Sequence, residues 1–441
     1  MRAEDWTYSP VPAVETAMAD IAARHGRWHN KSLDIVHALL DRLGNPHHNM
    51  PPTFHVAGTN GKGSTLAFLE AAFAAGGLTT HKYTSPHLVR CEERINIKGR
   101  NITPEAFLSA LQQVKNAAEG LEVSFFCFLT AMAFLSFSRT KADAVLLETG
   151  MGGRLDATNA VMPAVSIITP VSLDHMHLLG DTPAAIAREK AGIIKKNTPI
   201  ISAAQEQDAM ESITQAAHDL SAPLYRSGNE WHVTSTQNGF AYKTEKKHIN
   251  LPPPALAGAH QIMNAGTAIA ALEQTKFSFL ATPETLTKAM RSVTWPGRLQ
   301  RLRTGPLVDS LPDGWELWID GAHNDAGAAV LAAQARYWGK DKPLHIAIGR
   351  KAGREERLGF FTTLQPYAAS AIALDSGYIN APMASAQDIL LQMKKAGYEK
   401  TSAADTLKDA IDALVFQYDA PQRILVTGSL YLTGHILRTH G

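Results

Sequence analysis

The stretch FHVAGTNGKGST, residues 54–65, constrains the fold most, because it joins a β-prone run to a glycine-rich turn and then to a helical run. We expect a strand over Thr53–Ala57, a turn over Gly58–Gly63 and a helix that runs from Ser64 until the glycine pair at 76–77 ends it. Strand, tight turn and helix in this order form the unit from which parallel sheets covered by helices are built.

The same turn has the chemistry of a phosphate site, although its spelling differs from the usual loop, G-x-x-x-x-G-K-[ST]. Val56 stands where that loop has its first glycine, and Gly63 follows Lys62 directly. A plain β–α turn is the alternative interpretation. Backbone N–H groups at a glycine-rich turn and at the helix N-terminus behind it attract anions, and the lysine adds a positive charge. The residues predicted to bind nucleotide phosphates are Gly58, Thr59, Asn60, Gly61, Lys62, Gly63, Ser64 and Thr65.

Short apolar runs followed by helical stretches occur in two sets along the 441 residues, too many for one ordinary core. The first set is TFHVAG, DAVLLETG, AVSIITP and TPIISAA; the second, after residue 315, is LWIDGAH, LHIAIGR, SAIALDSG and RILVTGS. Pro296 and Gly297 interrupt the helical pattern between the sets. We predict an α/β protein with an N-terminal P-loop ATPase domain, residues 1–297, and a smaller C-terminal Rossmann-like α/β domain, residues 298–441. The first has a mainly parallel sheet and a small β excursion, in which EWHVTS and GFAYKTE form a hairpin.

Composition excludes several classes of partner. Lys and Arg number 42 and Asp and Glu 41, so there is no net field to attract nucleic acid or an anionic membrane. The 2 cysteines, Cys91 and Cys127, give neither a disulfide framework nor a thiolate metal site. The N-terminal segment MRAEDWTYSP lacks the apolar core of a signal peptide, and the apolar run Phe125–Phe137 is shorter than the ~20 residues of a membrane span. We expect that run to be a buried helix, and the protein to be cytoplasmic and monomeric with small-molecule partners.

A second candidate site feature is Glu148, a carboxylate that ends an apolar strand and precedes a glycine-rich loop. Ligand sites in open parallel sheets lie outside the carboxyl ends of the strands, so this carboxylate is placed to reach the metal of a bound nucleotide. A helix cap or a solvated loop acid is the alternative. Arg154 and Asp156 follow closely and are candidates for contact with a second substrate.

The segment VSLDHMHLLGDTPAAIAREKAGII contains two histidines, His175 and His177, and one lysine of interest. Spacing by a single residue, without a cysteine or a further histidine nearby, argues against a structural zinc site. Thr182 and Pro183 predict a helix start and Gly192 its end, which places Lys190 in the last turn. By itself this lysine would be interpreted as a solvated helical residue.

The ordered motifs of the chain resemble those of bacterial folylpolyglutamate synthases, including the bifunctional dihydrofolate synthases, of the Mur ligase superfamily. The motifs are LDRLGNPH, VAGTNGKGST, TSPHLVRCEERINIKG, GGRLDATN, LDHMHLLGDTPAAIAREKAGII, HQIMNA, WPGRLQ, DGAHN and VTGSLYLTG. The likeness covers about residues 35–435, and it implies that residues 1–297 form a Mur ligase-type ATP-binding central domain. It also implies that G-T-N-G-K-G-S is the phosphate loop in this family's own spelling.

The resemblance further implies roles for individual residues. Lys62 would hold the nucleotide phosphates, and Lys190 would be carbamylated, which turns a cation that repels metal into an anion. The expected catalytic residues are Lys62, Lys190, His175 and Arg298. The expected ligands of two Mg²⁺ ions are Ser85, Glu148, His175 and Lys190. The expected ATP contacts outside the loop are Gln261, Asn264, Arg298, Asp320 and His323. The expected substrate contacts are Ser124, Phe126, Arg154, Asp156 and Ala157.

The chain departs from the family pattern in four places. Cys127 stands where the family has a glutamate, Thr149 where a valine is usual, and Asp325 where a proline is usual. The loop GRKAGRE, residues 349–355, lacks the acidic character of its counterparts. None of these changes removes an expected metal ligand or phosphate contact.

The implied activity is ATP-dependent amide formation between L-glutamate and dihydropteroate, (tetrahydro)folate or both, through an acyl phosphate. A monofunctional folylpolyglutamate synthase is the alternative within the family. A peptidoglycan-precursor ligase would need a further N-terminal domain, and only 57 residues precede Gly58. A P-loop NTPase or phosphotransferase, or a nucleotide-binding module without activity, would not need His175, Lys190 and Asp320 together.

Overall fold

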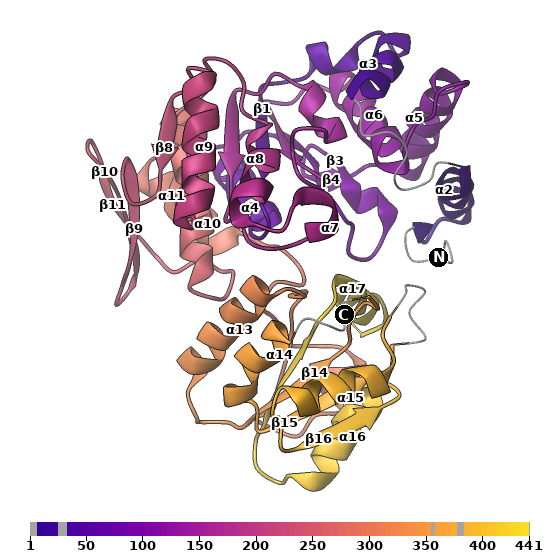
Figure 1. Ribbon diagram of the computed structural model, residues 1–441, viewed down its shortest axis with the longest axis vertical. Coiled ribbons are helices and arrows are strands. Elements are labelled where there is room, and N and C mark those ends of the chain that lie inside the picture. Colours follow the sequence, from indigo (N-terminus) through magenta and orange to yellow (C-terminus); the bar gives the residue numbers. More distant parts are fainter. Residues whose placement is uncertain (1–6, 25–32, 354–357, 377–382, 441) are drawn as a thin grey trace. The chain divides into compact units, whose positions relative to one another are not determined.

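The structure, a computed structural model, describes residues 7–24, 33–353, 358–376 and 383–440 (Figure 1). Within them the chain forms two compact units. The larger comprises Trp6–Ala255 and His260–Trp295, and the smaller includes Leu256–Ala259 and Pro296–Gly441. The chain thus passes from one unit to the other directly before His260 and directly after Trp295. Residues 1–6 and the last two residues of the loop at 349–355 lie outside the described residues.

An eight-stranded sheet forms the centre of the larger unit, in the order β4-β3-β2-β5-β1-β6-β7-β8. Every pairing from β2 to β8 is parallel, whereas β3 and β4 add antiparallel pairs at one edge. The strands are β1 (Thr53–Ala57), β2 (Thr80–Tyr83), β3 (Ile95–Ile97), β4 (Arg100–Asn101), β5 (Ala144–Glu148), β6 (Val165–Ile168), β7 (Ile200–Ser202) and β8 (Leu224–Arg226).

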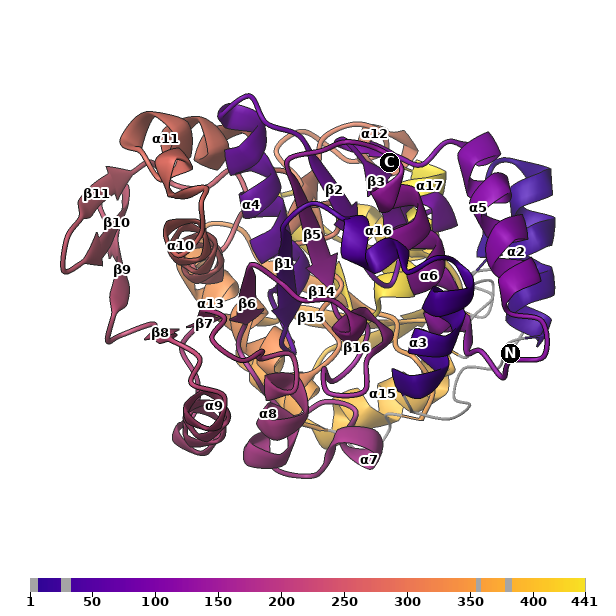
Figure 2. The same cartoon turned by 90° about the horizontal axis from the view of Figure 1, so that it is seen from above.

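Helices cover both faces of this sheet (Figure 2). Phe54 of β1 packs edge-on against Phe73 of α4, with ring centroids 5.6 Å apart. The next residue, His55, points to the opposite face because successive side chains of a strand alternate. The helices are α2 (Pro12–Arg24), α3 (Leu33–Arg42), α4 (Lys62–Ala75), α5 (Pro104–Ala117), α6 (Phe125–Ser138), α7 (Met176–Leu179), α8 (Pro183–Ala191), α9 (Gln207–Asp219), α10 (His260–Glu273) and α11 (Pro283–Ser292), with short 3₁₀ turns η1 (Pro46–Asn49), η2 (Cys91–Arg94), η3 (Ala157–Ala160) and η4 (Ser278–Leu280).

The apolar run at 125–137 forms helix α6, and almost all of its side chains are buried in one core with α2, α3 and α5. The prediction of a buried helix is therefore confirmed. Among the described residues, none of the helices combines the length and the apolar character that crossing a membrane requires. Cys91 and Cys127 are both buried free thiols.

The β excursion forms a separate antiparallel sheet of three strands, β9 (Trp231–Thr236), β10 (Gly239–Thr244) and β11 (His248–Leu251). The predicted hairpin is confirmed, since Gly239 pairs with Thr236 at the turn. The sheet lies against α10 where Gly266 leaves room: a Cβ there would lie 2.4 Å from Cγ1 of Val233.

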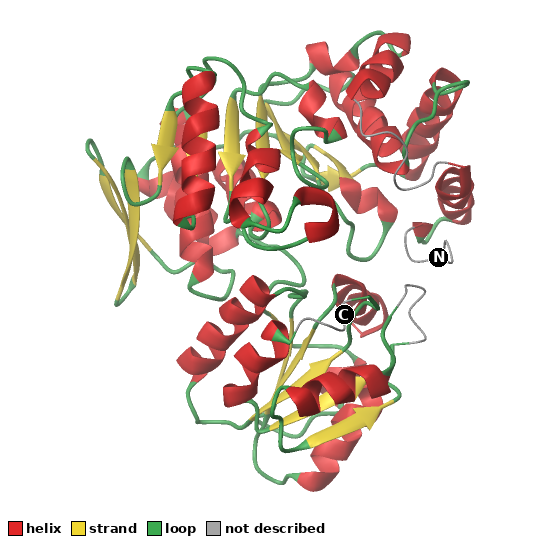
Figure 3. Ribbon diagram, in the orientation of Figure 1, coloured by secondary structure: helices red, strands yellow, loops and turns green. Residues whose placement is uncertain are grey.

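The smaller unit contains a six-stranded sheet in the order β12-β13-β17-β14-β15-β16, with only β12 antiparallel to its neighbour. Helices flank it in the secondary-structure view (Figure 3). The predicted α/β class, with a large parallel-rich sheet and a second mixed sheet, is confirmed. The strands are β12 (Gln300–Leu302), β13 (Glu316–Ile319), β14 (Leu344–Ile348), β15 (Ser370–Leu374), β16 (Thr401–Ala404) and β17 (Arg423–Thr427). The helices are α12 (Pro306–Asp309), α13 (Asp325–Trp338), α14 (Gly359–Leu364), α15 (Ala386–Lys395), α16 (Leu407–Gln417) and α17 (Leu430–His440), with η5 (Gln365–Tyr367).

Candidate active site

The glycine-rich loop joins β1 to α4 and needs glycine at two positions where the backbone is left-handed. Gly58 has φ 148° and Gly61 has φ 89°. Space is short as well: a Cβ on Gly58 would lie 1.8 Å from Oγ1 of Thr169, at the end of β6. Only glycine lets the loop pass this close to the neighbouring strand.

The middle of the loop is held by the segment that follows β6. The N–H groups of Thr59 and Asn60 donate to the carbonyl of Pro170 at 3.0 and 3.4 Å. The Thr59 hydroxyl donates to the carbonyl of Ser172 at 3.1 Å and accepts from the N–H of Ser172 at 3.0 Å. These bonds fix the curvature of the loop before α4 begins, while Ser64 and Thr65 are buried in the first turn of that helix.

Helix α10 meets the loop at Gly61. A Cβ on Gly61 would lie 2.6 Å from Oδ1 of Asn264. Asn264 also donates to Oε1 of Gln261 at 2.9 Å, and Gln261 is fully buried. The two polar residues of HQIMNA are thus packed against the phosphate loop.

The residue that closes over the start of α4 is Trp295. A Cβ on Gly63 would lie 2.5 Å from Cζ2 of this indole. Lys82 of β2 lies over the ring, with its Nζ 5.1 Å from the centroid, and forms an ion pair with Glu70 of α4. The last residue of the larger unit is therefore packed directly on the loop.

Two lysine ammonium groups converge on one loop carbonyl. Nζ of Lys62 donates to the carbonyl of Gly58 at 3.2 Å and to that of Thr59 at 3.3 Å. Nζ of Lys190, from the last turn of α8, donates to the same Gly58 carbonyl at 2.9 Å. Lys62 also lies 3.9 Å from Oε1 of Glu148, which is buried at the end of β5. Positive charge is therefore concentrated at the carboxyl ends of β1 and β5.

Lys190 is 4% exposed, unlike the solvated lysine that its sequence context suggests. Burial and the nearby Lys62 lower the pKa of Lys190 to about 7, although Asp174 and Asp156 act in the opposite direction. A large fraction of this amine is therefore neutral near neutral pH and able to act as a nucleophile.

Two of the expected metal ligands, Ser85 and Glu148, are in direct contact. The backbone N–H of Ser85 donates to Oε2 of Glu148 at 3.2 Å, so these two residues, whose side chains carry the oxygen donors that Mg²⁺ prefers, are in contact. His175 caps α7 with a left-handed backbone, φ 49°. Among the described residues, no three His, Cys, Asp or Glu side chains form a metal-binding group. The oxygen donors fit a hard cation, and a carbamate on Lys190 would add another anionic oxygen.

The expected substrate residues gather beyond β5, around the buried carboxylate of Asp156. Phe126 lies against Gly150, where a Cβ would be 2.5 Å from its Cζ, and its ring centroid is 5.9 Å from that of Tyr83. Burial raises the pKa of Asp156, and hydrogen bonds from Thr158 and from the Met151 N–H oppose that rise.

The other three expected substrate residues have local structural partners. Ser124 caps α6 by accepting from the N–H of Cys127 at 3.2 Å. Arg154 is exposed and forms an ion pair with Glu189 at 2.8 Å. Ala157 is buried in the core beside α6.

The expected nucleotide residues of the smaller unit surround the turn after β13. Asp320 accepts from the N–H groups of Leu299 and Ala322, both at 2.7 Å. Burial raises the pKa of Asp320, and the positive charge of Arg298 opposes that rise. Nδ1 of His323 lies 2.9 Å from the carbonyl of Gly321. Within this unit, the carboxylate of Asp320 and the guanidinium of Arg298 thus both lie near the carboxyl end of β13.

Four residues of the larger unit's site escaped prediction from the sequence: His55, Thr158, Thr169 and Trp295. Thr169 and Trp295 each lie more than a hundred positions from the glycine that they contact, so no local sequence pattern predicts the contact. For Trp295, the neighbouring Pro296 and Gly297 mark a boundary, which is the only local signal.

The chain matches known proteins over most of its length. Residues 56–272 match the family model "Mur ligase middle domain". The dihydrofolate synthase/folylpolyglutamate synthase of Bacillus subtilis is 32% identical over 413 residues, which cover 90% of this chain and 92% of the relative.

Solved structures are similar as well. Escherichia coli FolC in complex with DHPP and ADP superposes with a TM-score of 0.85 at 28% identity, covering 97% of each chain. A bifunctional folylpolyglutamate synthase/dihydrofolate synthase with Mn, AMPPNP and L-glutamate bound has a TM-score of 0.82 at 27% identity, covering 99% of this chain and 98% of the other.

Proposed function

The chain belongs to the dihydrofolate synthase/folylpolyglutamate synthase family of Mur ligases, and we propose that it joins L-glutamate to dihydropteroate and to (tetrahydro)folates with ATP. The acceptor carboxylate attacks the γ-phosphorus of ATP and releases ADP. The α-amine of glutamate then attacks the acyl phosphate, loses a proton and displaces inorganic phosphate. Phosphorylation is needed because a carboxylate oxygen is a poor leaving group.

The observation that carries this proposal is the convergence of Lys62 and Lys190 on the Gly58 carbonyl beside Glu148. Lys62 supplies positive charge that opposes the negative charge that develops as the γ-phosphoryl group moves, and the lowered pKa of Lys190 leaves an amine that can form the carbamate assigned below. A loop that only filled a β–α turn would not require one buried and one half-buried lysine amine on the same carbonyl, because burying such a group is costly. In this reading Lys62 contacts the β- and γ-phosphates.

Two groups of residues in the larger unit act on the nucleotide, one by shaping the loop and one by binding directly. Thr59 and Asn60 hold the loop on Pro170, and the backbone from Gly61 to Ser64 faces the phosphates at the start of α4. Gln261 and Asn264 support the base side, and the family resemblance also implies nucleotide contacts for Arg298, Asp320 and His323. Arg298 neutralises phosphate charge.

We assign Mg²⁺ to Ser85, Glu148, His175 and a carbamate on Lys190. The metal supplies charge neutralisation at the phosphates. A neutral amine is required for reaction with CO₂, and the pKa of Lys190, lowered to about 7, makes that form available near neutral pH. As the pH falls below 7 the ammonium form increases and carbamate formation declines. Bicarbonate in the assay should therefore raise activity most on the acid side.

The acceptor site contains Asp156, Phe126 and Ser124, with Arg154 and Ala157 at its edge. A pterin ring is flat, apolar on its faces and rich in N–H groups along one edge, so it suits an aromatic wall beside a carboxylate. The reaction takes place in the cytoplasm, where ATP is available and the two buried thiols remain reduced. The enzyme acts as a monomer.

The test is release of ADP from Mg-ATP in the presence of L-glutamate, with 7,8-dihydropteroate or tetrahydrofolate as acceptor and mass analysis of the products. We expect each acceptor to gain one glutamate. Gain on tetrahydrofolate alone would assign the monofunctional folylpolyglutamate synthase. Hydrolysis of ATP without glutamate and without any mass gain would replace the ligase with an NTPase.

The matched variants are Lys62→Ala and Lys288→Ala. Lys288 lies on α11 in an exposed pair with Glu284, so its loss leaves ligation unchanged. Loss of Lys62 abolishes most of it, because the phosphate charge is no longer opposed. Equal activity of the two variants would contradict the role given to the loop.

A further inference from the structure

A chain of hydrogen bonds connects strand β1 to the carboxylate of Asp156 through two residues that have no assigned role, His55 and Thr158. The Thr158 hydroxyl donates to Oδ1 of Asp156 at 2.6 Å. Nε2 of His55 lies 2.8 Å from the same hydroxyl oxygen. His55 and Thr158 are both completely buried, and 103 positions separate them in the sequence.

The direction of each proton in this chain follows from the number of hydrogens available. A threonine hydroxyl has one hydrogen, and Thr158 gives it to Asp156, so toward His55 its oxygen only accepts. Nε2 of His55 must therefore carry a hydrogen. Burial lowers the pKa of His55 to about 3, with a small contribution from Lys195, so the ring is neutral and Nδ1 carries none.

The hydrogen bonds that Asp156 makes with Thr158 and Met151 all come from donors. Oδ1 accepts from the N–H of Thr158 at 3.0 Å and from its hydroxyl, and Oδ2 accepts from the N–H of Met151 at 2.9 Å. Burial raises the pKa of Asp156, and these hydrogen bonds oppose that rise and fix the plane of the two carboxylate oxygens. The group is therefore held as an acceptor in one orientation.

We propose that His55 and Thr158 are positioning residues, which hold Asp156 as a fixed hydrogen-bond acceptor for the amino and N–H edge of a pterin. The proposal rests on the function proposed above, in which Asp156 contacts the acceptor substrate. It extends the substrate site to His55 of β1, whose side chain points to the sheet face opposite α4 and which precedes Gly58 of the phosphate loop by three residues.

Burying the imidazole of His55 is destabilising, and a residue needed only for core packing would not require it. Nδ1 of His55 has no hydrogen-bond partner within the described residues, and an unpaired buried polar atom is destabilising. The neighbouring strand positions hold Phe54 and Val56, and an apolar side chain at 55 would avoid the penalty. The imidazole is instead retained with one N–H directed at Thr158.

Charged and titratable groups around Asp156 come from three other elements. Tyr83 of β2, Cys127 of α6 and Lys190 of α8 all interact electrostatically with it. Burial raises the pKa of the Cys127 thiol to about 12, with a further rise from Asp156, so this thiol is neutral. Asp156 is thus the carboxylate that meets the substrate on this side, and the hydroxyl of Thr158 keeps its orientation.

The kinetic test compares Thr158→Val with Thr158→Ser, and His55→Leu with His55→Gln. Valine keeps the shape of threonine but removes the donor, and leucine removes the N–H that glutamine retains. We expect Thr158→Val to raise KM for dihydropteroate about tenfold with KM for ATP unchanged, since one hydrogen bond to a charged group is lost. Serine and glutamine should restore most of the affinity. Equal rises in both KM values, or a fall in kcat alone, would overturn the positioning role.

The matched control is His81→Gln. His81 is a second completely buried histidine of the same sheet, in β2, whose Nε2 contacts the backbone carbonyl of Thr140 at 2.8 Å. Its replacement disturbs the sheet without touching Asp156, so both KM values should stay near those of the unmodified protein. A selective rise in KM for dihydropteroate in this control would indicate a general effect of sheet damage and contradict the proposal.

A spectroscopic test keeps the hydrogen-bond chain separate from the ligase activity. In the full-length protein labelled with ¹⁵N-histidine, the signal lost in His55→Gln identifies His55. We expect the neutral Nε2–H tautomer across neutral and mildly acidic pH, and a shifted Nε2 signal in Thr158→Val. An Nδ1–H tautomer or a charged ring would overturn the chain of bonds. If the unmodified protein glutamylates no acceptor while this tautomer is seen, the proposed function fails and the chain of bonds stands as a structural feature.

Discussion

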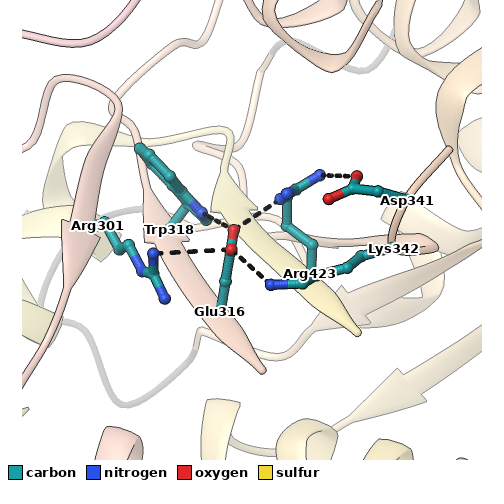
Figure 4. A network of polar contacts seen from close by, with 6 residues as sticks. All are labelled: Arg301, Glu316, Trp318, Asp341, Lys342 and Arg423. Carbon is teal, nitrogen blue, oxygen red and sulfur yellow. Dashed lines mark hydrogen bonds and ion pairs between the residues drawn. The ribbon is translucent and has the colours of Figure 1, made fainter. Parts of the chain in front are cut away.

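Each unit buries a cluster of charged side chains at one edge of its sheet, and the two clusters differ in how well the charges are compensated. In the larger unit, Lys62 and Lys190 both donate to the Gly58 carbonyl, and Oε1 of Glu148 lies 3.9 Å from Nζ of Lys62. In the smaller unit, the carboxylate of Glu316 accepts from Arg423 and Lys342 at 2.8 and 2.7 Å (Figure 4).

In the smaller unit, cations and an N–H donor surround the carboxylate of Glu316. Besides those two cations, Glu316 accepts from the indole N–H of Trp318 at 3.0 Å and lies 3.6 Å from Arg301. Arg423 also forms an ion pair with Asp341, with Nη1 3.4 Å from Oδ1. Burial alone would raise the pKa of Glu316, but the hydrogen bonds from Arg423, Lys342 and Trp318 outweigh it and lower the pKa to about 2.

The difference separates charges that hold the fold from charges that perform chemistry. Glu316 and Arg423 begin their strands, at the edge opposite to the one where ligands bind in open sheets. Lys62 and Glu148 lie at the carboxyl ends of β1 and β5, and Lys190 reaches the Gly58 carbonyl at the same place, where ligands bind in open sheets. Substitutions in the first cluster should therefore change stability, and those in the second should change activity.

The largest expected effect is that of Lys190→Met on activity. We expect kcat to fall by roughly 10³-fold, because the variant cannot form the carbamate that would hold Mg²⁺. Its melting temperature should not fall, since a buried amine with a lowered pKa is replaced by an apolar side chain. Steady-state ADP release and thermal unfolding measure the two quantities. A strong loss of stability would place Lys190 with the structural charges.

The next effect is that of Glu316→Gln on stability. We expect unfolding free energy to drop by about 3 kcal/mol, because Arg423 and Lys342 lose their shared anion in a site where the Glu316 side chain is only 9% exposed. Urea titration measures the change. The control is Lys408→Ala, which breaks an exposed pair with Asp412 and should change stability by less than about 0.5 kcal/mol. KM for ATP should be unaltered in both variants. A raised KM in Glu316→Gln would contradict the claim that this cluster affects stability alone.

Acid should remove the contribution of Glu316 by degrees. Its folded pKa of about 2 lies below the ordinary value of 4.5, so the stabilisation is complete above pH 4.5 and is lost as the pH falls towards 2. The difference in stability between the unmodified protein and Glu316→Gln should therefore shrink over this range. Chemical unfolding at several pH values follows it, and a constant difference down to pH 2 would show that the network does not control the carboxyl group.

The smallest expected effect is that of Gly63→Ala. The added methyl would meet the Trp295 ring at 2.5 Å, so the loop or the indole must shift, and we expect KM for ATP to rise about tenfold. Adding Trp295→Ala to this variant should recover part of the loss, in a double-mutant cycle. Additive effects of the two substitutions would show that the contact has no influence on the loop.

Local sequence signals predicted most of the fold. Thr182, Pro183 and Gly192 bracket helix α8, which runs from Pro183 to Ala191. The β-prone runs predicted strand β1, which leads into the loop before Lys62, and strand β5, which ends at Glu148, because alternation and turn residues act over short distances.

Long-range contacts were beyond such signals. Asn264 against Gly61, Trp295 against Gly63, and His55 against Thr158 all depend on how distant elements pack. The same holds for Lys190: its place in the last turn of a helix was predictable, but its burial beside Lys62 was not. The ion pair of Arg154 with Glu189 likewise joins two segments 35 positions apart.

The contact between Gly63 and Trp295 also constrains the order in which these two positions can change during evolution. A side chain at position 63 has room only after the indole at 295 has been replaced by something smaller, so the two sites must change in a fixed order. Among descendants of this sequence, a larger residue at 63 should be found only together with a smaller one at 295, whereas glycine at 63 tolerates either.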